Sequence, residues 1–520
     1  MTVAGDLDLR HHAAGDGEAR PLRWGKVIDQ TRCIGCHACT TACKSENEVP
    51  LSVTRTYVKY VDVGVFPEAR RAFQVTRCNQ CDDAPCVTAC PTSAMFRRED
   101  GIVDFDKAVC IGCKACIAAC PYDAIFINPE DHSAEKCNFC AHRLDVGLEP
   151  ACVVVCPTQA ILVGDLDDPL SPVAQITRRD SVAVRRPEKG TRPKLFYKGG
   201  HQATLDPLAA RRPEGGLFLW SEQGAQVGGG TGRAGPAPTS SAAALLSYDV
   251  SHHAPWDWRV SLYTWTKGIA AGAYLAPLVL TLLGLLDWGS SLWLWAAPVV
   301  GLGLLAATGG ILIWDLEHPR RFLYLFLRPQ WRSWLVRGAV AISAYGAVLA
   351  AQLLLSAVGL ETPQKWLAIA GIPAAVAAAV YTGYLFAQAK ARDLWQSPLL
   401  VPHLLVQALL LGSAVLLPLA HWLAAEAVGP LEWLIAGSAL AHLVMAAGEA
   451  SVTHGTAHAR LAAYELTRGR YARWFWAGAA LVAAALFAPL IGVVAVPLAL
   501  LGLLAHEHAY VQAGQSVPLA

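Results

Sequence analysis

Sixteen cysteines are the residues of this sequence whose type and spacing most clearly predict chemistry. All of them lie between Cys33 and Cys156, and they fall into four groups of four. A C-x2-C-x2-C loop, found in the first and third groups, can hold three irons of a cubane, while a fourth cysteine three residues later reaches a neighbouring cluster. The spacing therefore predicts paired 4Fe-4S clusters. The groups are Cys33, Cys36, Cys39, Cys43; Cys78, Cys81, Cys86, Cys90; Cys110, Cys113, Cys116, Cys120; and Cys137, Cys140, Cys152, Cys156.

Zinc ribbons and disulfides are the alternatives for so many cysteines. Zinc sites use CxxC pairs but usually lack a C-x2-C-x2-C-x3-C run. A disulfide scaffold belongs to secreted proteins, and the N-terminal residues contain no apolar core of a secretory signal. Since every cysteine fits a group and none is left over, we expect four complete clusters on a head that faces the cytoplasm.

The elements that hold these cysteines differ from the rest of the chain. Of the 520 residues, 54% are hydrophobic, and the net charge of +1 argues against a nucleic-acid partner. From about Trp265 onward Leu, Ala, Val and Gly dominate. We expect an N-terminal tail at 1–24, an electron-transfer domain at 25–215, a flexible Gly/Pro/Ser-rich linker at 216–255, and a membrane domain at 256–520.

The second half contains eight apolar segments long enough to span a bilayer. Arg and Lys gather in the loops after the second, fourth and sixth segments, where eleven lie, whereas the opposite loops contain only Lys365. By the positive-inside rule, both ends of the membrane domain and the iron–sulfur head should face the cytoplasm. We therefore expect a multi-pass protein of the inner membrane. The segments lie near 264–286, 292–314, 336–358, 366–389, 399–420, 431–450, 473–489 and 491–510.

Polar residues within or beside these segments are candidates for binding a quinone or moving protons, because buried ionisable groups are costly in lipid. Each also has a structural interpretation: Trp265 could belong to an interfacial belt, and Lys267 could extend to the membrane surface. His442 and Glu449, seven residues apart on one helix face, are candidates for a proton path or for an interhelical hydrogen bond. The quinone candidates are Trp265, Lys267, Asp315, His318, Tyr381, Tyr384, Gln388 and His403.

Histidines on facing helices could also hold haem. The histidines within or near the segments are His403, His421, His442, His506 and His508, and only His403 and His442 are expected to lie deep enough. The only CxxCH run, at residues 33–37, lies within the first ferredoxin-type group and not beside these histidines, so no haem is expected.

Two longer motifs carry a family resemblance. With CNQCDDAPCVTACP and CNFC…ACVVVCP, residues 25–200 resemble the four-cluster iron–sulfur subunit of the DMSO reductase family, which includes polysulfide reductase, formate dehydrogenase and nitrate reductase partners. Residues 248–520, with TWTKGIAAGAYL, DLEHPRRFLYLFLRP, YTGYLFAQAKARDLWQSPLL and VQAGQSVP, resemble the NrfD-like anchor of polysulfide reductase. The resemblance implies an α+β ferredoxin-like head of two pseudo-symmetric dicluster units, followed by an all-α membrane bundle.

The resemblance also implies ligand sets, which the spacing alone leaves open between this pairing and a sequential one. It further implies that clusters a and b face a catalytic partner, that c and d face the membrane, and that Tyr381 is the best quinone candidate. The implied sets are cluster a, Cys33, Cys36, Cys39 and Cys156; cluster b, Cys137, Cys140, Cys152 and Cys43; cluster c, Cys78, Cys81, Cys86 and Cys120; and cluster d, Cys110, Cys113, Cys116 and Cys90.

The expected function is a fused electron-transfer and anchor subunit of an oxidoreductase complex. Electrons would pass between a molybdopterin or tungstopterin catalytic subunit, a separate protein, and membrane menaquinone or ubiquinone. The alternative is an electron-transfer and proton-translocating module of a hydrogenase or of an alternative complex III. The substrate of the partner and the direction of electron flow stay open, because cluster potentials depend on surroundings that sequence does not reveal.

Overall fold

The computed structural model describes residues 22–212 and 244–520. Most of the predicted N-terminal tail (1–24) and most of the predicted linker (216–255) lie outside these residues. The chain divides into a head unit, Met1–Gly112, Cys120–His253 and Pro518–Ala520, and a helical unit, Cys113–Ala119 and Ala254–Val517. The short segment Cys113–Ala119 thus belongs to the helical unit although it carries two cysteines of the third group.

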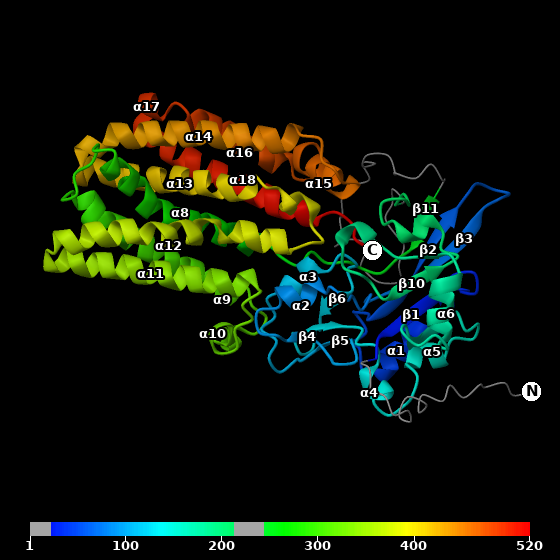
Figure 1. Cartoon of the computed structure of the whole chain (residues 1–520). Coiled ribbons are helices and arrows are strands. Elements are labelled where there is room, and N and C mark those ends of the chain that lie inside the picture. The colour runs from blue at the N-terminus through cyan, green and yellow to red at the C-terminus, as the bar shows by residue number, and fades with distance from the viewer. Residues whose placement is uncertain (1–21, 213–243) are drawn as a thin grey trace, which may run out of the picture. The chain divides into compact units, whose positions relative to one another are not determined.

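A four-stranded sheet forms the first layer of the head (Figure 1). Its order is β8 (Ile161–Asp165), β1 (Trp24–Asp29), β10 (Leu195–Lys198) and β9 (Val182–Ala183). β1 pairs in parallel with β10 and antiparallel with β8, so strands that are more than 130 residues apart in the sequence share one sheet.

A second sheet has the order β11 (Ala244–Tyr248), β2 (Thr56–Val63) and β3 (Arg70–Arg77). Alternation along β2 and β3 buries Val58 and Val75, which join Ile28 and Tyr197 of the first sheet in one apolar core. β11 lies in the range predicted as a linker, yet it pairs antiparallel with β2.

Hairpins and short helices hold the cysteine loops. The hairpins are β4 (Met95–Arg97) with β5 (Val103–Phe105), and β6 (Ile125–Ile127) with β7 (Ala134–Lys136). The helices beside the cysteines are α1 (Ala38–Glu46), α2 (Pro85–Ala89), α3 (Ala115–Ala119), α4 (Ala141–Leu144) and α5 (Ala151–Val154). Two further helices of the head are α6 (Pro172–Arg179) and α7 (Gln202–Leu205).

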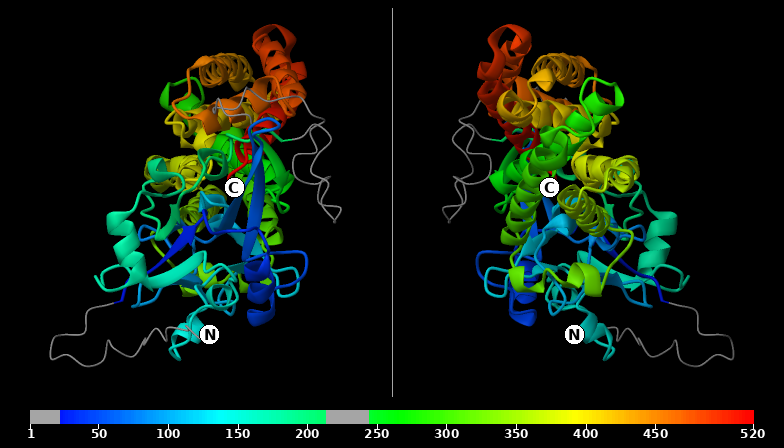
Figure 2. Two further views of the ribbon diagram at one scale, coloured as in Figure 1. Left: turned by 90° about the vertical axis from the view of Figure 1, so that its right-hand side faces the viewer. Right: turned by 90° about the vertical axis from the view of Figure 1, so that its left-hand side faces the viewer.

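The helical unit is built from long helices that run back and forth, and the right-hand view of Figure 2 looks along them. Short helices lie between them: α10 (Tyr324–Leu327), α15 (Ala457–Thr467) and α17 (Ala488–Ile491). The long helices are α8 (Trp258–Leu282), α9 (Ala297–Trp314), α11 (Trp334–Val358), α12 (Glu361–Gln388), α13 (Leu400–Leu423), α14 (Val428–Ser451), α16 (Ala472–Ala485) and α18 (Ala495–Gln515).

Within the described residues, six helical segments are long and apolar enough to cross a membrane, compared with the eight expected. α8 has 25 residues but is not among the six, since Lys267 and several hydroxyl-bearing residues lower its mean hydropathy. α16 has only 14 residues, since it ends at Ala485 and a turn separates it from α17, which begins at Ala488. The six are Leu292–Trp314, Trp334–Val358, Thr362–Gln388, Leu400–Leu423, Ala425–Ser451 and Ala488–Gln515.

Glycines bring α8 and α13 into the closest packing of the bundle. A Cβ on Gly272 would lie 1.7 Å from the carbonyl oxygen of Ala408, and one on Gly412 would lie 2.0 Å from the carbonyl carbon of Gly272. Such close approach is typical of membrane helices, which associate through small residues.

Candidate functional site

The four cysteine groups share one local design. In each group a short helix begins one residue before the third cysteine, and the fourth cysteine follows four residues later. One helical turn separates the two sulfurs, so one helix can present them to two different clusters. The four pairs are Cys39 and Cys43, Cys86 and Cys90, Cys116 and Cys120, and Cys152 and Cys156.

The loops of the first and third groups have matching backbones. Gly35 and Gly112 have φ of 71° and 70°, and the residues two positions later, His37 and Lys114, have φ of 59° and 61°. These left-handed residues curl each loop around a centre. All sixteen cysteines are free thiols in the structure.

Neighbouring thiols affect one another's protonation in the head. Burial, together with the thiols of Cys137, Cys152 and Cys140, raises the pKa of Cys43 to about 12. The thiol of Cys43 therefore stays neutral at pH 7 until a metal displaces its proton.

The other groups show the same kind of neighbourhood. Burial and the thiols of Cys78, Cys86 and Cys120 raise the pKa of Cys81 well above its usual value. Burial is also the main reason why the pKa of Cys90 is raised, and the nearby thiol of Cys110 adds to it. Each of these neighbours belongs to the same set in the pairing that the family resemblance implies, and the ligand sets themselves stay a prediction.

Three buried cations lie among these sulfurs. Arg77, which is 2% exposed, donates from Nη1 to Sγ of Cys152 at 2.9 Å, while its Nε and Nη2 have no hydrogen-bond partner. Lys26 Nζ lies 4.0 Å from the same sulfur, and Lys136 is fully buried. In the described part of the chain no carboxylate lies within ion-pair distance of any of the three.

Unpaired buried cations are costly unless an anion offsets their charge. A 4Fe-4S cluster held by four thiolates is anionic, so this donor set and its surroundings fit such clusters.

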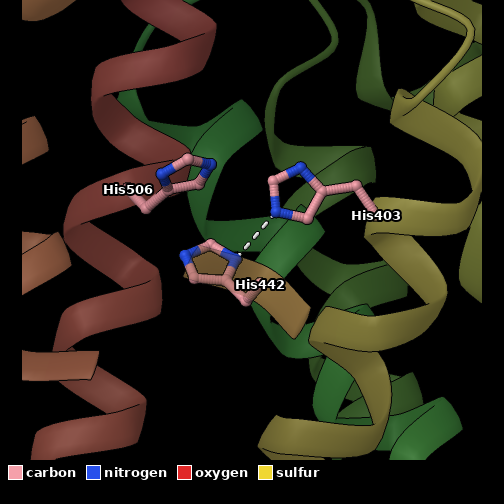
Figure 3. A group of neighbouring side chains, drawn as sticks. All are labelled: His403, His442 and His506. Carbon is pink, nitrogen blue, oxygen red and sulfur yellow. Dashed lines mark hydrogen bonds between the residues drawn. The ribbon is translucent and has the colours of Figure 1, made fainter. Parts of the chain in front are cut away.

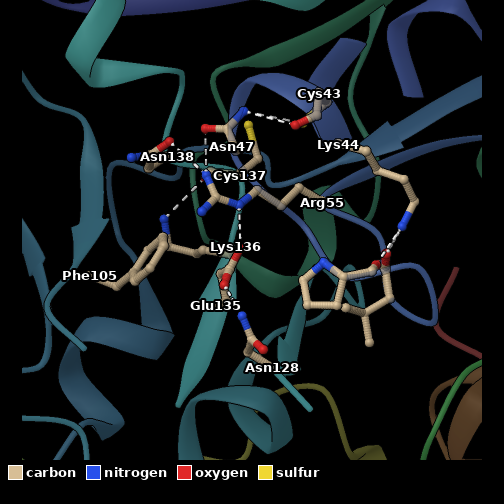
Figure 4. Close-up of polar contacts among 12 residues, drawn as sticks. Cys43, Lys44, Asn47, Arg55, Phe105, Asn128, Glu135, Lys136, Cys137 and Asn138 are labelled. Carbon is tan, nitrogen blue, oxygen red and sulfur yellow. Dashed lines mark hydrogen bonds and ion pairs between the residues drawn. The ribbon is translucent and has the colours of Figure 1, made fainter. Parts of the chain in front are cut away.

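A polar network holds one further donor against the sulfurs (Figure 4). Arg55 pairs with Glu135 at 2.6 Å and donates to Oδ1 of Asn47 at 2.8 Å. With its oxygen engaged, Asn47 directs Nδ2 towards Sγ of Cys43 and of Cys140, each at 3.7 Å. Backbone N–H groups also donate to sulfur, as from Ala160 to Cys156 at 3.2 Å. Such hydrogen bonds influence cluster potentials.

In the helical unit, two of the predicted quinone residues come together. Lys267, which is 1% exposed, donates to the carbonyl of Ala379 at 2.6 Å and to Oγ1 of Thr382 at 2.8 Å. Its ammonium lies 4.7 Å from the ring centroid of Tyr381. Thr382 was not among the predicted residues, although it lies next to Tyr381 in the motif that suggested this site.

A second group of predicted residues also meets (Figure 3). His403 and His442 share a 2.8 Å hydrogen bond between Nε2 and Nδ1, and Nδ1 of His403 lies 3.6 Å from Glu449 Oε2. The expectation that only His403 and His442 lie deep was wrong, because His506 is 3% exposed and its ring centroid is 4.6 Å from that of His442. α18 extends to Gln515, which puts His506 well inside the helix.

Other candidates are engaged elsewhere. Trp265 donates to the carbonyl of Leu500 at 2.9 Å and joins α8 to α18. Tyr384 stacks on Trp334 at 4.3 Å, and Gln388 bridges the backbone of Trp334 and of Arg332.

The residues after α9 form a charged group within the helical unit. Asp315 is 9% exposed, and His318 is half-buried. Lys114 of the segment Cys113–Ala119 pairs with Glu317 at 2.9 Å and lies 3.8 Å from Asp315.

Comparison with known proteins agrees with the division of the chain into a head and a helical unit. Residues 24–45 match a 4Fe-4S binding domain and residues 70–166 a 4Fe-4S dicluster domain, while residues 247–504 match the family "Polysulphide reductase, NrfD". A subunit of the tetrathionate reductase of Salmonella typhimurium is 44% identical over 208 residues, which cover 38% of this chain and 80% of that protein. The chain belongs to this family of iron–sulfur subunits, fused to an NrfD domain.

Two further relatives support the family. Protein NrfC of Escherichia coli K12 is 45% identical over 204 residues, covering 38% of this chain and 92% of that protein. A polypeptide of the polysulfide reductase of Wolinella succinogenes is 44% identical over 177 residues, covering 34% of this chain and 93% of that protein. The relatives thus correspond to a head-sized part of the chain, and the NrfD match accounts for most of the rest. The chain is a membrane protein related to subunits of reductase complexes.

Proposed function

We propose that the chain passes electrons between a molybdopterin or tungstopterin catalytic subunit and the membrane quinone pool through four 4Fe-4S clusters. The observation that carries this proposal is the set of unpaired buried cations beside four groups of thiols, in a chain that continues into an NrfD domain. When bound, such clusters supply one-electron transfer. The fused chain itself positions the thiols, offsets their charge and fixes one head to one anchor.

The names of the relatives support the class of partner. They are subunits of tetrathionate, polysulfide, dimethyl sulfoxide and arsenate reductases. We propose a catalytic subunit of this kind for the present chain, with a sulfur compound or an arsenic oxyanion among its possible substrates.

We further propose eight membrane spans, which count α8 and α16 with the six that are apolar enough. Exposed tryptophans support this proposal. They lie near the helix ends on both sides of the bundle and so form two belts, as expected at the two surfaces of a membrane. Trp258, Trp314, Trp331, Trp474 and Trp476 lie near one set of ends, and Trp295, Trp366, Trp422 and Trp433 near the other.

The cytoplasmic orientation of the head is part of the proposal. Exposed arginines gather at the first set of helix ends, as with Arg320, Arg328 and Arg470. Arg392, counted among the loop charges, is instead buried and donates to the carbonyl of Gln515 at the end of α18. Without Arg392 the basic residues still lie overwhelmingly in one set of loops, so the positive-inside rule gives the same orientation.

For the quinone we propose the surroundings of Lys267, Tyr381 and Thr382. A cation held in a dry site can donate to a quinone carbonyl and stabilise the negative charge that reduction places there. His403 is a weaker candidate because both of its ring nitrogens are engaged. The proton path through His442 and Glu449 stays a prediction.

Reoxidation of the reduced chain by a soluble quinone analogue tests the function. We expect dithionite-reduced wild-type protein to be reoxidised by the quinone, and Lys267→Met to slow this at least tenfold while its iron content is unchanged. Lys365→Met is the matched control, since that lysine is exposed beside Trp288 in the first turns of α12. A wild-type protein that no quinone reoxidises would refute the quinone link.

A further inference from the structure

We propose that His403, His442 and His506 form a binding site for a divalent transition metal ion of the zinc class, separate from the iron–sulfur clusters. The proposal goes beyond electron transfer to quinone and does not depend on it. It rests on geometry, burial and hydrogen bonding in the helical unit.

The three imidazoles come from three different helices, α13, α14 and α18, and converge on one point (Figure 3). One ligand nitrogen from each lies within 4.8 Å of the others. Around a tetrahedral zinc ion, with Zn–N bonds of about 2.0–2.1 Å, ligand nitrogens lie about 3.4 Å apart. Small side-chain rotations would therefore bring all three onto one ion.

Burial leaves these rings without enough partners. Their exposed fractions are 1% for His403, 1% for His442 and 3% for His506, and Nε2 of His442 has no hydrogen-bond partner. A single hydrogen bond joins two of the three rings. A buried imidazole nitrogen without a partner is costly, and a metal ion would use the lone pairs that the cluster leaves free.

A carboxylate stands behind the first imidazole. Glu449, which is 7% exposed, places Oε2 3.6 Å from Nδ1 of His403, and Ser397 donates to its Oε1 at 3.2 Å. This is the carboxylate–histidine arrangement that orients metal-bound imidazoles and makes them better donors. It leaves Nε2 of His403 as the ligand atom, and its negative charge partly offsets that of a divalent ion.

The donor set and the spacing select the type of ion. Imidazole suits zinc, copper, nickel and iron, whereas magnesium and calcium prefer oxygen. Haem does not fit between His403 and His442, because axial ligands lie on opposite faces of the porphyrin and these two nitrogens are 2.8 Å apart. The competing use of the same residues is a metal-free proton path, and metal binding by the purified protein decides between the two.

Cobalt titration of the purified full chain, freed of loosely bound metal by a chelator, tests the site. Added Co²⁺ should give visible bands of a low-symmetry nitrogen site with one ion bound per chain, and Zn²⁺ should displace it. X-ray absorption at the zinc edge should show about three imidazole ligands. Iron is measured in parallel, so that loss of clusters is seen separately from failure of this site.

Matched variants locate the site. His442→Gln and His506→Gln should each weaken binding at least a hundredfold, and Glu449→Gln should weaken it by about 10–100-fold. His508→Gln is the control, since His508 lies two residues along the same helix against Trp474 and should bind the metal like wild type.

Two outcomes would overturn the proposal. One is a wild-type chain that binds neither ion while His442→Gln slows quinone turnover, which would assign the cluster to proton transfer. The other is a zinc edge spectrum without imidazole ligands. The spectrum needs only wild-type protein, so a variant that fails to fold does not weaken the test.

Discussion

The head and the helical unit differ in the partners of their buried polar groups. In the head, Arg77 and Lys26 lie against cysteine sulfur with no carboxylate in ion-pair distance among the described residues. In the helical unit, Lys267 is held by a backbone carbonyl and a hydroxyl, and Tyr274 and Tyr345 donate to the carbonyls of Ala368 and Ala270.

This difference distinguishes two kinds of site. The head is electrostatically incomplete as protein alone, since its cations need an anion to offset them. The helical unit largely satisfies itself, as a fold in lipid must, because lipid offers no hydrogen bonds. The histidine cluster is one of the exceptions there, since Nε2 of the buried His442 has no hydrogen-bond partner, and we argue above that it supports an additional ligand. The following changes test this comparison, beginning with the loss of a whole cluster.

Loss of a predicted ligand should remove a whole cluster. We expect Cys120→Ala to lower the iron content from about 16 to about 12 atoms per chain, because cluster c loses its fourth thiolate. Iron and sulfide analysis of the purified chain measures this.

A double variant decides the pairing of the motifs. Cys81→Ala with Cys120→Ala should still contain about 12 iron atoms if both bind cluster c, and about 8 if the motifs pair sequentially. The nearby thiols of Cys81 and Cys120 support the first result. An iron content near 8 would refute the ligand sets proposed above.

Tight packing of the bundle gives the next largest effect. Gly272→Ala should destabilise the helical unit by about 1–3 kcal/mol, because the new methyl group meets the carbonyl of Ala408. Thermal unfolding in detergent, followed by helical circular dichroism, should show a lower midpoint with unchanged iron content.

Gly303→Ala on α9 is the control, since nothing lies within 4 Å of its added Cβ. Equal midpoints for Gly272→Ala and Gly303→Ala would contradict the close contact of α8 with α13.

Removing one of the unpaired cations of the head should shift the reduction potentials without removing clusters. Arg77→Gln takes a positive charge away from Sγ of Cys152, 2.9 Å distant, and so disfavours the more negative, reduced form. We expect the reduction potentials of clusters a and b to fall, as measured by redox titration with electron paramagnetic resonance.

Two further variants serve as controls for the measurement of the reduction potentials. Arg77→Lys should restore most of the potential because it keeps the charge. Arg71→Gln on the same strand should change nothing, since Arg71 is exposed and paired with Asp62 at 2.6 Å. Equal shifts for the variants at 71 and 77 would indicate a long-range effect of net charge instead.

The sequence predicts features that depend on neighbouring residues better than features that depend on contacts between distant parts of the chain. The cysteine loops are encoded within a few residues, so their spacing predicts short helices and paired sulfurs. The membrane site depends on contacts between helices that are distant in sequence. Trp265 and Gln388 looked like quinone ligands, yet they bind backbone of α18 and of the residues at the start of α11. His506 was not counted among the deep histidines, yet it meets His442 from a helix that is distant in the sequence, with 4.6 Å between the ring centroids.

A pH-dependent effect concerns a half-buried histidine of the head that, unlike Arg77, has carboxylate partners. His252 lies 2.5 Å from Asp123 and 3.2 Å from Asp249. Burial lowers the pKa of His252, but these two carboxylates outweigh it and raise the pKa to about 9. A folded-state pKa above the unfolded value of about 6.5 contributes stability that is fully present below pH 6.5 and is lost as the pH rises through 9.

We therefore expect the head to lose up to about 3 kcal/mol of stability between pH 6.5 and 9 through this group. His252→Gln should lower the unfolding temperature at pH 6 and flatten its decline with pH, as followed by the visible absorbance of the clusters. His253→Gln, at the exposed neighbouring position, should keep the wild-type slope. If the unfolding temperature of His252→Gln declines with pH as steeply as that of wild type, the histidine is neutral in the folded head. The carboxylate partners of His252 would then have no bearing on the comparison with Arg77.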